Sequence, residues 1–283
     1  MQSNVGIQLR VKYIRLGRVR LVRHFDSARL WELAPRRVDV PVAYTEGFTS
    51  RPKVGFCLAL PTSAESLAEY VDLDLSRDAR LDATEPGWIE WLGELTGSLP
   101  SALPTGMDVV AIAERDVAEG SLQKSVTSTT WELTGWNPDD GPADDVSGKA
   151  DELDILIQGV LETDEVFVER KRKGQGRTDD VRPLIRDLTL RASDCGPTVV
   201  ADLITIGRAR RPSELAELIS PGIDGTGIRV LRMHQLIDTE GERREVIPDE
   251  RQSNGTNQHD RPREHVVEKR RRTARSHAGG QTQ

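Results

Sequence analysis

The order of alternating and helical apolar patterns constrains this fold most, because one order occurs twice. Residues 7–120 read as strand, helix, strands, helix, strand. The strands predicted in this half are 7–23 (a bent strand or a pair around Gly17), 41–45, 53–60, 68–75 and 107–114. The predicted helices are a short or kinked one that begins with Asp26 as N-cap and meets Pro35, and one at 85–95.

A second half, residues 127–237, shows a similar order after a polar stretch. Its predicted strands are 128–134, 165–171, 183–191, 198–206 and 228–233, and its predicted helices are 150–161 and 212–219. Two consecutive β-α-β-β-α-β-like halves predict an α+β fold of two tandem ferredoxin-like halves. Residue similarity between them is too weak to define a sequence repeat.

The last segment of the chain loses this periodicity. Residues 238–283 mix Arg, Glu, Gln, Asn and Gly, and such a segment buries too little apolar surface to offset the entropy of ordering. We therefore expect a disordered, charged tail over 238–283.

Composition limits the classes of function. The formal net charge of −7 argues against a surface that binds nucleic acid over its whole extent, because phosphate contacts need an excess of Lys and Arg. Local basic patches stay compatible with that charge. The two cysteines, Cys57 and Cys195, lie far apart in sequence, and neither has a second Cys or a His at metal-ligand spacing. We expect no disulfide, metal site or cofactor.

The N-terminus has no charged segment followed by an apolar one, and no stretch reaches the length of a membrane-spanning helix. The expectation is a cytoplasmic protein with no membrane contact, and the sequence leaves the oligomeric state open.

One continuous run names a family. Residues 41–54 (PVAYTEGFTSRPKV), together with His24, Asp26, the segment 69–72 (EYVD) and the segment 180–183 (DVRP), resemble the radical SAM-associated, or radical SAM-linked, family, domain of unknown function 2344. The resemblance covers residues 7–236. Thr45 replaces the usual Ser, Ser50-Arg51 replaces the usual Pro-His, and Leu60-Pro61-Thr62-Ser63 lacks the usual glycine.

The resemblance implies possible partners of the protein but no particular reaction. The family has no established activity, but it is often fused to, or encoded beside, a radical SAM protein and near ribonuclease E/G genes. A radical SAM enzyme needs three closely spaced cysteines for its iron–sulfur cluster, and this chain has two isolated ones. The implied partners are thus a separate radical SAM enzyme and RNA.

Two segments, one just before the run and one within it, contain candidate site residues. His24 beside Asp26 could act in acid–base chemistry or could fix a strand–helix corner, and the corner is the reading we favour because no nucleophile or metal spacing accompanies the pair. The loop that follows offers an anion or RNA site or, equally, a structured hairpin with Phe48 packed inward. The predicted binding residues here are Arg29, Thr45, Glu46, Gly47, Phe48, Arg51 and Lys53.

The second half carries its own basic cluster. Arg170, Lys171, Arg172 and Lys173 are consecutive, and Arg182 follows in the segment 180–183. They are candidates for contact with a polyanion, whereas the alternative is a solvated hairpin tip.

Three hypotheses follow from these features. The first is a non-catalytic RNA-binding or substrate-presenting accessory to a separate radical SAM enzyme. The second is a metal-independent RNA-processing enzyme that uses His24, an analogy drawn from fold alone. The third is a protein–protein adaptor.

Overall fold

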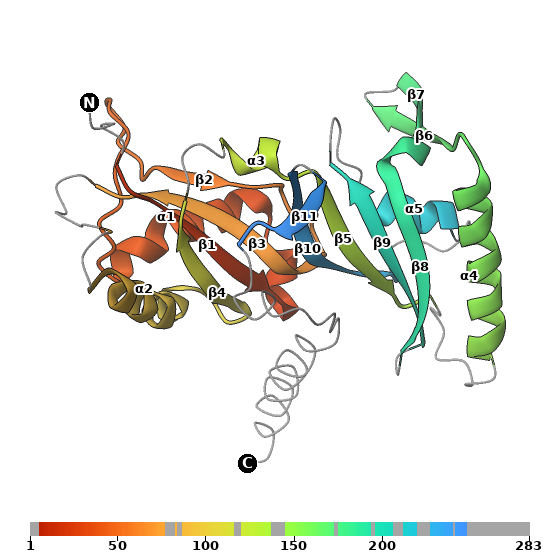
Figure 1. Cartoon of the computed structure of the whole chain (residues 1–283), viewed down its shortest axis with the longest axis horizontal. Helices are drawn as coiled ribbons and strands as arrows, with labels where there is room; N and C mark the ends of the chain where they lie inside the picture. The colour runs from red at the N-terminus through yellow and green to blue at the C-terminus, as the bar shows by residue number, and fades with distance from the viewer. Residues whose placement is uncertain are drawn as a thin grey trace, which may run out of the picture. The chain divides into compact units, whose positions relative to one another are not determined.

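The protein is described by a computed structural model over residues 6–76, 83, 87–115, 120–136, 145–172, 175–193, 196–205, 212–219, 227–239 and 241–247. All of these residues belong to one compact unit, Met1–Ile247. The unit mixes helices and strands around a core that is mainly sheet (Figure 1), which agrees with the mixed fold expected from the sequence.

A nine-stranded sheet runs through both halves. Its strands, in spatial order, are β4 (Met107–Glu114), β1 (Gln8–Arg15), β3 (Glu65–Asp74), β10 (Arg229–Thr239), β5 (Ser128–Thr134), β9 (Gly196–Ile204) and β8 (Ile185–Ser193). In addition, β2 (Val54–Phe56) pairs with β3 and β11 (Glu242–Glu245) pairs with β10. A separate pair consists of β6 (Phe167–Arg172) and β7 (Gln175–Asp180).

Strand β1 shows why the first half folds as it does. Its alternation places Leu9, Val11 and Tyr13 on one face, where they are buried in a core shared with helices α1 (His24–Arg37) and α2 (Gly87–Ser98). The ring of Tyr13 lies 4.8 Å from that of the buried Trp31 of α1, measured between centroids. The opposite face of β1 carries polar residues, and it is this face that matters for the site below.

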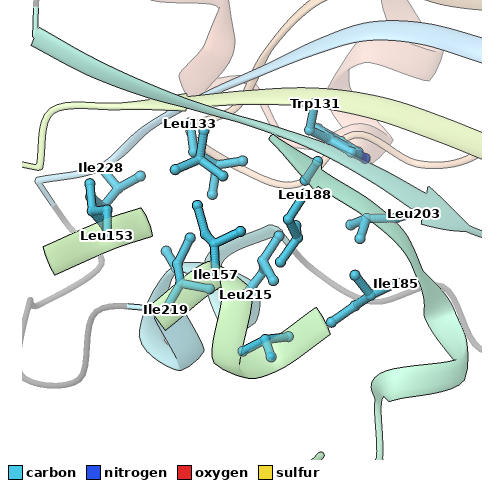
Figure 2. Close-up of a cluster of buried hydrophobic side chains, with 14 of the residues drawn as sticks. Trp131, Leu133, Leu153, Ile157, Ile185, Leu188, Leu203, Leu215, Ile219 and Ile228 are labelled. Atoms are coloured by element: carbon cyan, nitrogen blue, oxygen red, sulfur yellow. The ribbon is translucent and has the colours of Figure 1, made fainter. Parts of the chain in front are cut away.

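The second half has a larger apolar core. Helices α4 (Asp145–Glu162) and α5 (Pro212–Ile219) pack on β5, β8 and β9, and Figure 2 shows their side chains pointing toward those of the strands. Leu153, Ile157 and Ile219 are fully buried there. The predicted helix at 212–219 and the strand at 128–134 have the bounds expected from the sequence.

The two halves meet where β10 lies beside β3. The two strands are parallel and pair at Leu231 with Glu65 and at Arg232 with Ser66. We call this pairing, with the buried side chains around Arg232 and Gln235, the seam. A small apolar cluster at the seam joins Cys57, Tyr70, Leu122, Ile237 and Val246. The halves therefore share one sheet.

Several predicted boundaries need correction. Strand β1 ends at Arg15 and a 3₁₀ turn, Gly17–Leu21, follows, because Gly17 takes a positive φ of 74° and its N–H donates to the Glu65 carboxylate at 2.6 Å. The predicted strands at 41–45 and 53–60 reduce to isolated bridges and the short β2.

Helix α1 starts earlier and runs longer than expected. Arg23, not Asp26, is its N-cap, and Asp26 lies in the first turn, where a carboxylate still favours the helix dipole. Pro35 falls inside the last turn without ending the helix before Arg37.

The expected tail boundary at residue 238 is also too early. Strand β10 continues to Thr239, and Glu242–Glu245 form β11 within the segment expected to be disordered. Val246 is buried. The remainder of the predicted tail, 248–283, lies outside the described residues.

Candidate functional site

The N-terminus of α1 displays three of the predicted site residues. His24, Asp26 and Arg29 are exposed, as is Phe25, which has a relative exposure of 76%. The His24 imidazole packs edge-on against Phe56 of β2, with 5.6 Å between ring centroids. This contact places His24 between α1 and β2, and the choice between a structural and an acid–base role for His24 stays a prediction.

A closed loop follows, which we call the signature loop (residues 44–53). Thr45 closes it: its N–H donates to the Arg51 carbonyl at 2.8 Å, and its Oγ1 accepts from the Arg51 N–H at 3.0 Å. The Ser50 hydroxyl donates to the Thr45 carbonyl at 3.1 Å. Gly47 has a φ of +125°, which other residues rarely adopt.

Phe48 at the tip of this loop points away from the protein. Its relative exposure is 110%, so the interpretation in which Phe48 packs inward is wrong. Glu46, Arg51 and Lys53 are exposed as well. The loop thus presents an aromatic ring and two cations to solvent.

The base of the signature loop is firmly held. The Lys53 N–H donates to the Ala43 carbonyl at 2.8 Å, and the Asp74 N–H donates to the Lys53 carbonyl at 3.1 Å, which fixes the loop to β3. The Arg36 guanidinium of α1 lies 5.3 Å from the centre of the Tyr44 ring. Helix α1 therefore contacts the 44–56 segment at both of its ends.

A cavity of about 320 Å³ opens beside Lys53. We call it the polar cavity. It is bounded by β2, by the polar face of β1 and β3, by Arg115 directly after β4, and by Ser121 and Leu122 at the start of α3 (Leu122–Ser125). Its polar lining includes Gln8, Lys53, Asp72, Asp74 and Arg115.

The floor of the polar cavity is a network of charged and amide groups. Arg10 donates from Nε to Asp72 Oδ1 at 2.8 Å and from Nη2 to Oδ2 at 3.1 Å. Arg115 Nε lies 3.5 Å from Asp72 Oδ2, and Arg115 Nη1 donates to Gln8 Oε1 at 2.8 Å. Gln8 Nε2 in turn donates to Asp74 Oδ1 at 2.7 Å.

Sequence reasoning missed this floor. Gln8 and Arg10 pair across the sheet with Asp74 and Asp72, in the register that strand alternation demands. The alternating basic residues of β1 are visible in the sequence, but their acidic partners on β3 are more than 60 positions away. In the structure Arg10 is buried in an ion pair.

Farther along the same face, three polar groups converge on Glu245 of β11. Tyr70 donates its hydroxyl to Glu245 Oε2 at 3.0 Å, Lys12 Nζ lies 3.5 Å from that oxygen, and His234 Nδ1 contacts Oε1. Burial raises the pKa of Glu245, but the His234 hydrogen bond and the Lys12 charge outweigh it, so the pKa lies below its ordinary value. Burial raises the pKa of Tyr70 well above its ordinary value.

Arg182 has its donors engaged with the backbone. Its guanidinium donates to the carbonyls of Leu161 at 2.9 Å, Thr163 at 3.1 Å and Ile185 at 2.8 Å. Two of these carbonyls close the C-terminal end of α4, where cations are favoured. Arg182 therefore connects the end of α4 to the start of β8.

The basic cluster of the second half lies on another sheet. Arg170, Lys171 and Arg172 belong to β6, where they pair in register with Arg177, Gly176 and Gln175 of β7. Lys173 lies outside the described residues. Contact of this cluster with a polyanion stays a prediction.

Cys57 is buried at the seam, where its thiol donates to Gln235 Oε1 at 3.0 Å. Burial raises its pKa to about 12. Cys195 lies outside the described residues. Among the residues that the structure describes, no group of three or more His, Cys, Asp or Glu side chains is placed to hold a metal ion.

Of the helices described here, none is both long and apolar enough to cross a membrane. Comparison with known families matches residues 8–213 to the family described as "Uncharacterized protein conserved in bacteria (DUF2344)". No curated protein matches the chain. The match includes α1, the signature loop and the whole floor of the polar cavity.

Proposed function

The chain belongs to this family of uncharacterized bacterial proteins, and we propose that it is a non-catalytic, cytoplasmic accessory that binds RNA, or presents an RNA substrate, for a separate radical SAM enzyme. The observation that carries the proposal is the full exposure of Phe48 on a hydrogen-bonded loop that also exposes Arg51 and Lys53.

An exposed aromatic ring beside cations suits single-stranded RNA. Bases stack on aromatic side chains whatever their sequence, and each stacked base contributes about 1–3 kcal/mol. Arg51 and Lys53 would contact the flanking phosphates, and Arg29 would extend the cationic surface along α1. Because the hydrogen bonds of Thr45 hold the loop closed, little ordering would be required on binding.

The strand orders support the finer fold assignment within this proposal. The first half runs β4-β1-β3-β2 and the second β10-β5-β9-β8, with antiparallel neighbours in both. That order is expected if each half is a ferredoxin-like β-α-β-β-α-β unit. Such four-stranded sheets also serve as RNA-binding platforms in other proteins.

The accessory role rests on the number of cysteines. A radical SAM cluster needs three closely spaced thiolates, whereas the chain has two cysteines, the buried Cys57 and the distant Cys195. Anaerobic reconstitution with iron and sulfide should leave the purified chain without a stoichiometric cluster. A cluster in the purified protein would contradict the accessory role.

Binding of fluorescein-labelled single-stranded RNA, followed by anisotropy at low salt, tests the RNA proposal. Phe48→Ala should weaken binding by about tenfold, in keeping with the loss of one stacked base. The matched control is Ile155→Ala, because Ile155 of α4 is also a large exposed apolar residue, at 72%. If the wild type binds no RNA, or if both variants bind equally, the proposal fails and the protein-adaptor hypothesis leads.

Whether RNA stays intact on incubation with the protein distinguishes the RNA-processing enzyme hypothesis from the accessory role. An accessory should leave RNA intact in EDTA, and His24→Ala should change only affinity. If the wild type cleaves RNA without metal and His24→Ala does not, His24 is a catalytic residue and the accessory role is wrong.

A further inference from the structure

The polar cavity has features that the signature loop does not explain. Its volume of about 320 Å³ falls in the range of small-molecule sites. Its floor is preorganised, because Asp72 is held by Arg10 and Arg115, and Gln8 bridges Arg115 and Asp74. A buried network of this kind is costly to assemble unless its members are satisfied.

Two groups at the cavity keep capacity for a ligand. Asp74 is half-buried, and among the described contacts its bond to Gln8 uses Oδ1, so that Oδ2 remains as an acceptor. Lys53 is exposed, and no partner of its ammonium is recorded among the described residues. Lys53 can therefore bind an anionic group of a ligand, and Asp74 can accept a hydrogen bond from a hydroxyl or amino group of the same ligand.

Phe56 borders the cavity as part of β2, but it pairs with Val71, so its ring lies on the other face of the sheet, against His24 and the apolar core under α1. The charged side chains that line the cavity balance, with Lys53 and Arg115 against Asp72 and Asp74. The buried Arg10 pairs with Asp72 behind the lining and adds one positive charge, which favours an anionic ligand.

We propose that the polar cavity binds one ribonucleotide, with its 5′-phosphate on Lys53 and its ribose hydroxyls donating to Asp74. A carboxylate that accepts from ribose hydroxyls is a general way to select ribose, and a lysine ammonium is a common phosphate partner. The ligand is either a free nucleoside monophosphate or the 5′-terminal nucleotide of an RNA. The inference goes beyond the proposed loop surface and does not require RNA to bind there.

Calorimetric titration with AMP, GMP, CMP and UMP, and with the matching 2′-deoxynucleotides, tests the site. The wild type should bind at least one ribonucleotide in the micromolar to low millimolar range and bind its deoxy form at least fivefold more weakly. Asp74→Asn should remove most of this preference, which a merely structural role would not do. Lys53→Ala should weaken both forms by about tenfold or more.

The matched control for Lys53 is Lys124→Ala, because Lys124 is exposed on α3 and does not line the cavity. It should bind as the wild type does. Lys53 lies at the surface, so its variant remains informative if Asp74→Asn fails to fold. The proposal is overturned if no ribonucleotide binds at millimolar concentration, or if Lys53→Ala binds as tightly as Lys124→Ala.

Two arms distinguish the sources of the nucleotide. A 5′-phosphorylated RNA hexamer that competes with the monophosphate, while the 5′-hydroxyl hexamer does not, identifies the 5′ end of RNA as ligand. Monophosphate binding without competition from either hexamer identifies a free nucleotide. Binding of a free monophosphate that survives Phe48→Ala, in a protein that binds no RNA, supports the cavity and refutes only the loop proposal.

Discussion

The signature loop and the seam use the same residue type in opposite ways. Arg51 of the loop is exposed, whereas Arg232 at the seam is 2% exposed and donates to Glu69 at 2.7 Å and to the Leu58 carbonyl at 3.0 Å. The Arg232 guanidinium also lies 4.6 Å from the centre of the Trp131 ring. Arg232 therefore stabilises the fold, whereas the guanidinium of Arg51 is accessible to a ligand.

The difference is one of desolvation. A buried guanidinium needs partners for its charge and its donors, so losing either member of the pair is costly. An exposed guanidinium remains hydrated and contributes little to folding. Substitutions at the seam should therefore change stability, whereas substitutions in the signature loop should change binding.

Arg232→Ala should lower the free energy of unfolding by about 3–5 kcal/mol, because it leaves Glu69 buried without its partner. Urea unfolding followed by tryptophan fluorescence measures it. Arg232→Met with Glu69→Gln in the same chain should recover a large part of the loss, since it removes both charges. A loss under about 1 kcal/mol for Arg232→Ala would show that the seam does not depend on this pair.

Truncation should locate the end of the folded unit. A chain that ends at Ile247 should unfold as the full chain does, whereas one that ends at Asp238 should lose about 2–3 kcal/mol, because it lacks β11, buried Val246 and the Glu245 contacts. Thermal midpoints of the three chains measure this. Equal midpoints for both truncations would mean that β11 contributes nothing.

Glu245→Gln should lower stability at neutral pH by about 1–2 kcal/mol, because the carboxylate is hydrogen-bonded and paired. The pKa of Glu245 is depressed below its ordinary value of 4.5, so its contribution is complete above that value and is lost as pH falls through the lower folded pKa. The difference between wild type and variant, measured in urea at several pH values, should shrink in acid. A difference that grows in acid would contradict the assignment.

Arg51→Ala should change the free energy of unfolding by less than about 0.5 kcal/mol. The matched control is Arg191→Ala, because Arg191 is exposed on β8, away from the loop. Both should unfold in urea as the wild type does. A large loss for Arg51→Ala alone would mean that the side chain supports the loop, and its effect on RNA would then be indirect.

Sequence patterns predicted most elements and part of the site. Strong periodicity located β4, β5 and α5 with their observed bounds, because each buries one alternating or helical face. The strand expected at 41–45 was wrong, since the chain there makes bridges at Val42 and Tyr44 in place of a continuous ladder. Polar β11 has no apolar alternation, so it was assigned to the tail.

The candidate site also has a part that the sequence predicts and a part that it does not. Local signals identified the signature loop and the exposed residues of α1, because glycine and the aromatic and basic residues are adjacent in sequence. The polar cavity joins Gln8, Lys53, Asp74 and Arg115, which only the sheet register brings together. Which residues pair across the sheet cannot be predicted from local sequence patterns, so the cavity is visible only in the structure.

The salt dependence of RNA affinity tests the central claim most directly, because each phosphate contact on single-stranded RNA adds about 0.7 to the slope of log affinity against log salt concentration. The wild type should show a steep slope, and Arg51→Ala with Lys53→Ala should flatten it by about one unit or more, while Arg191→Ala leaves it unchanged. A slope that is the same in the wild type and the double variant would contradict the proposal that the signature loop binds RNA.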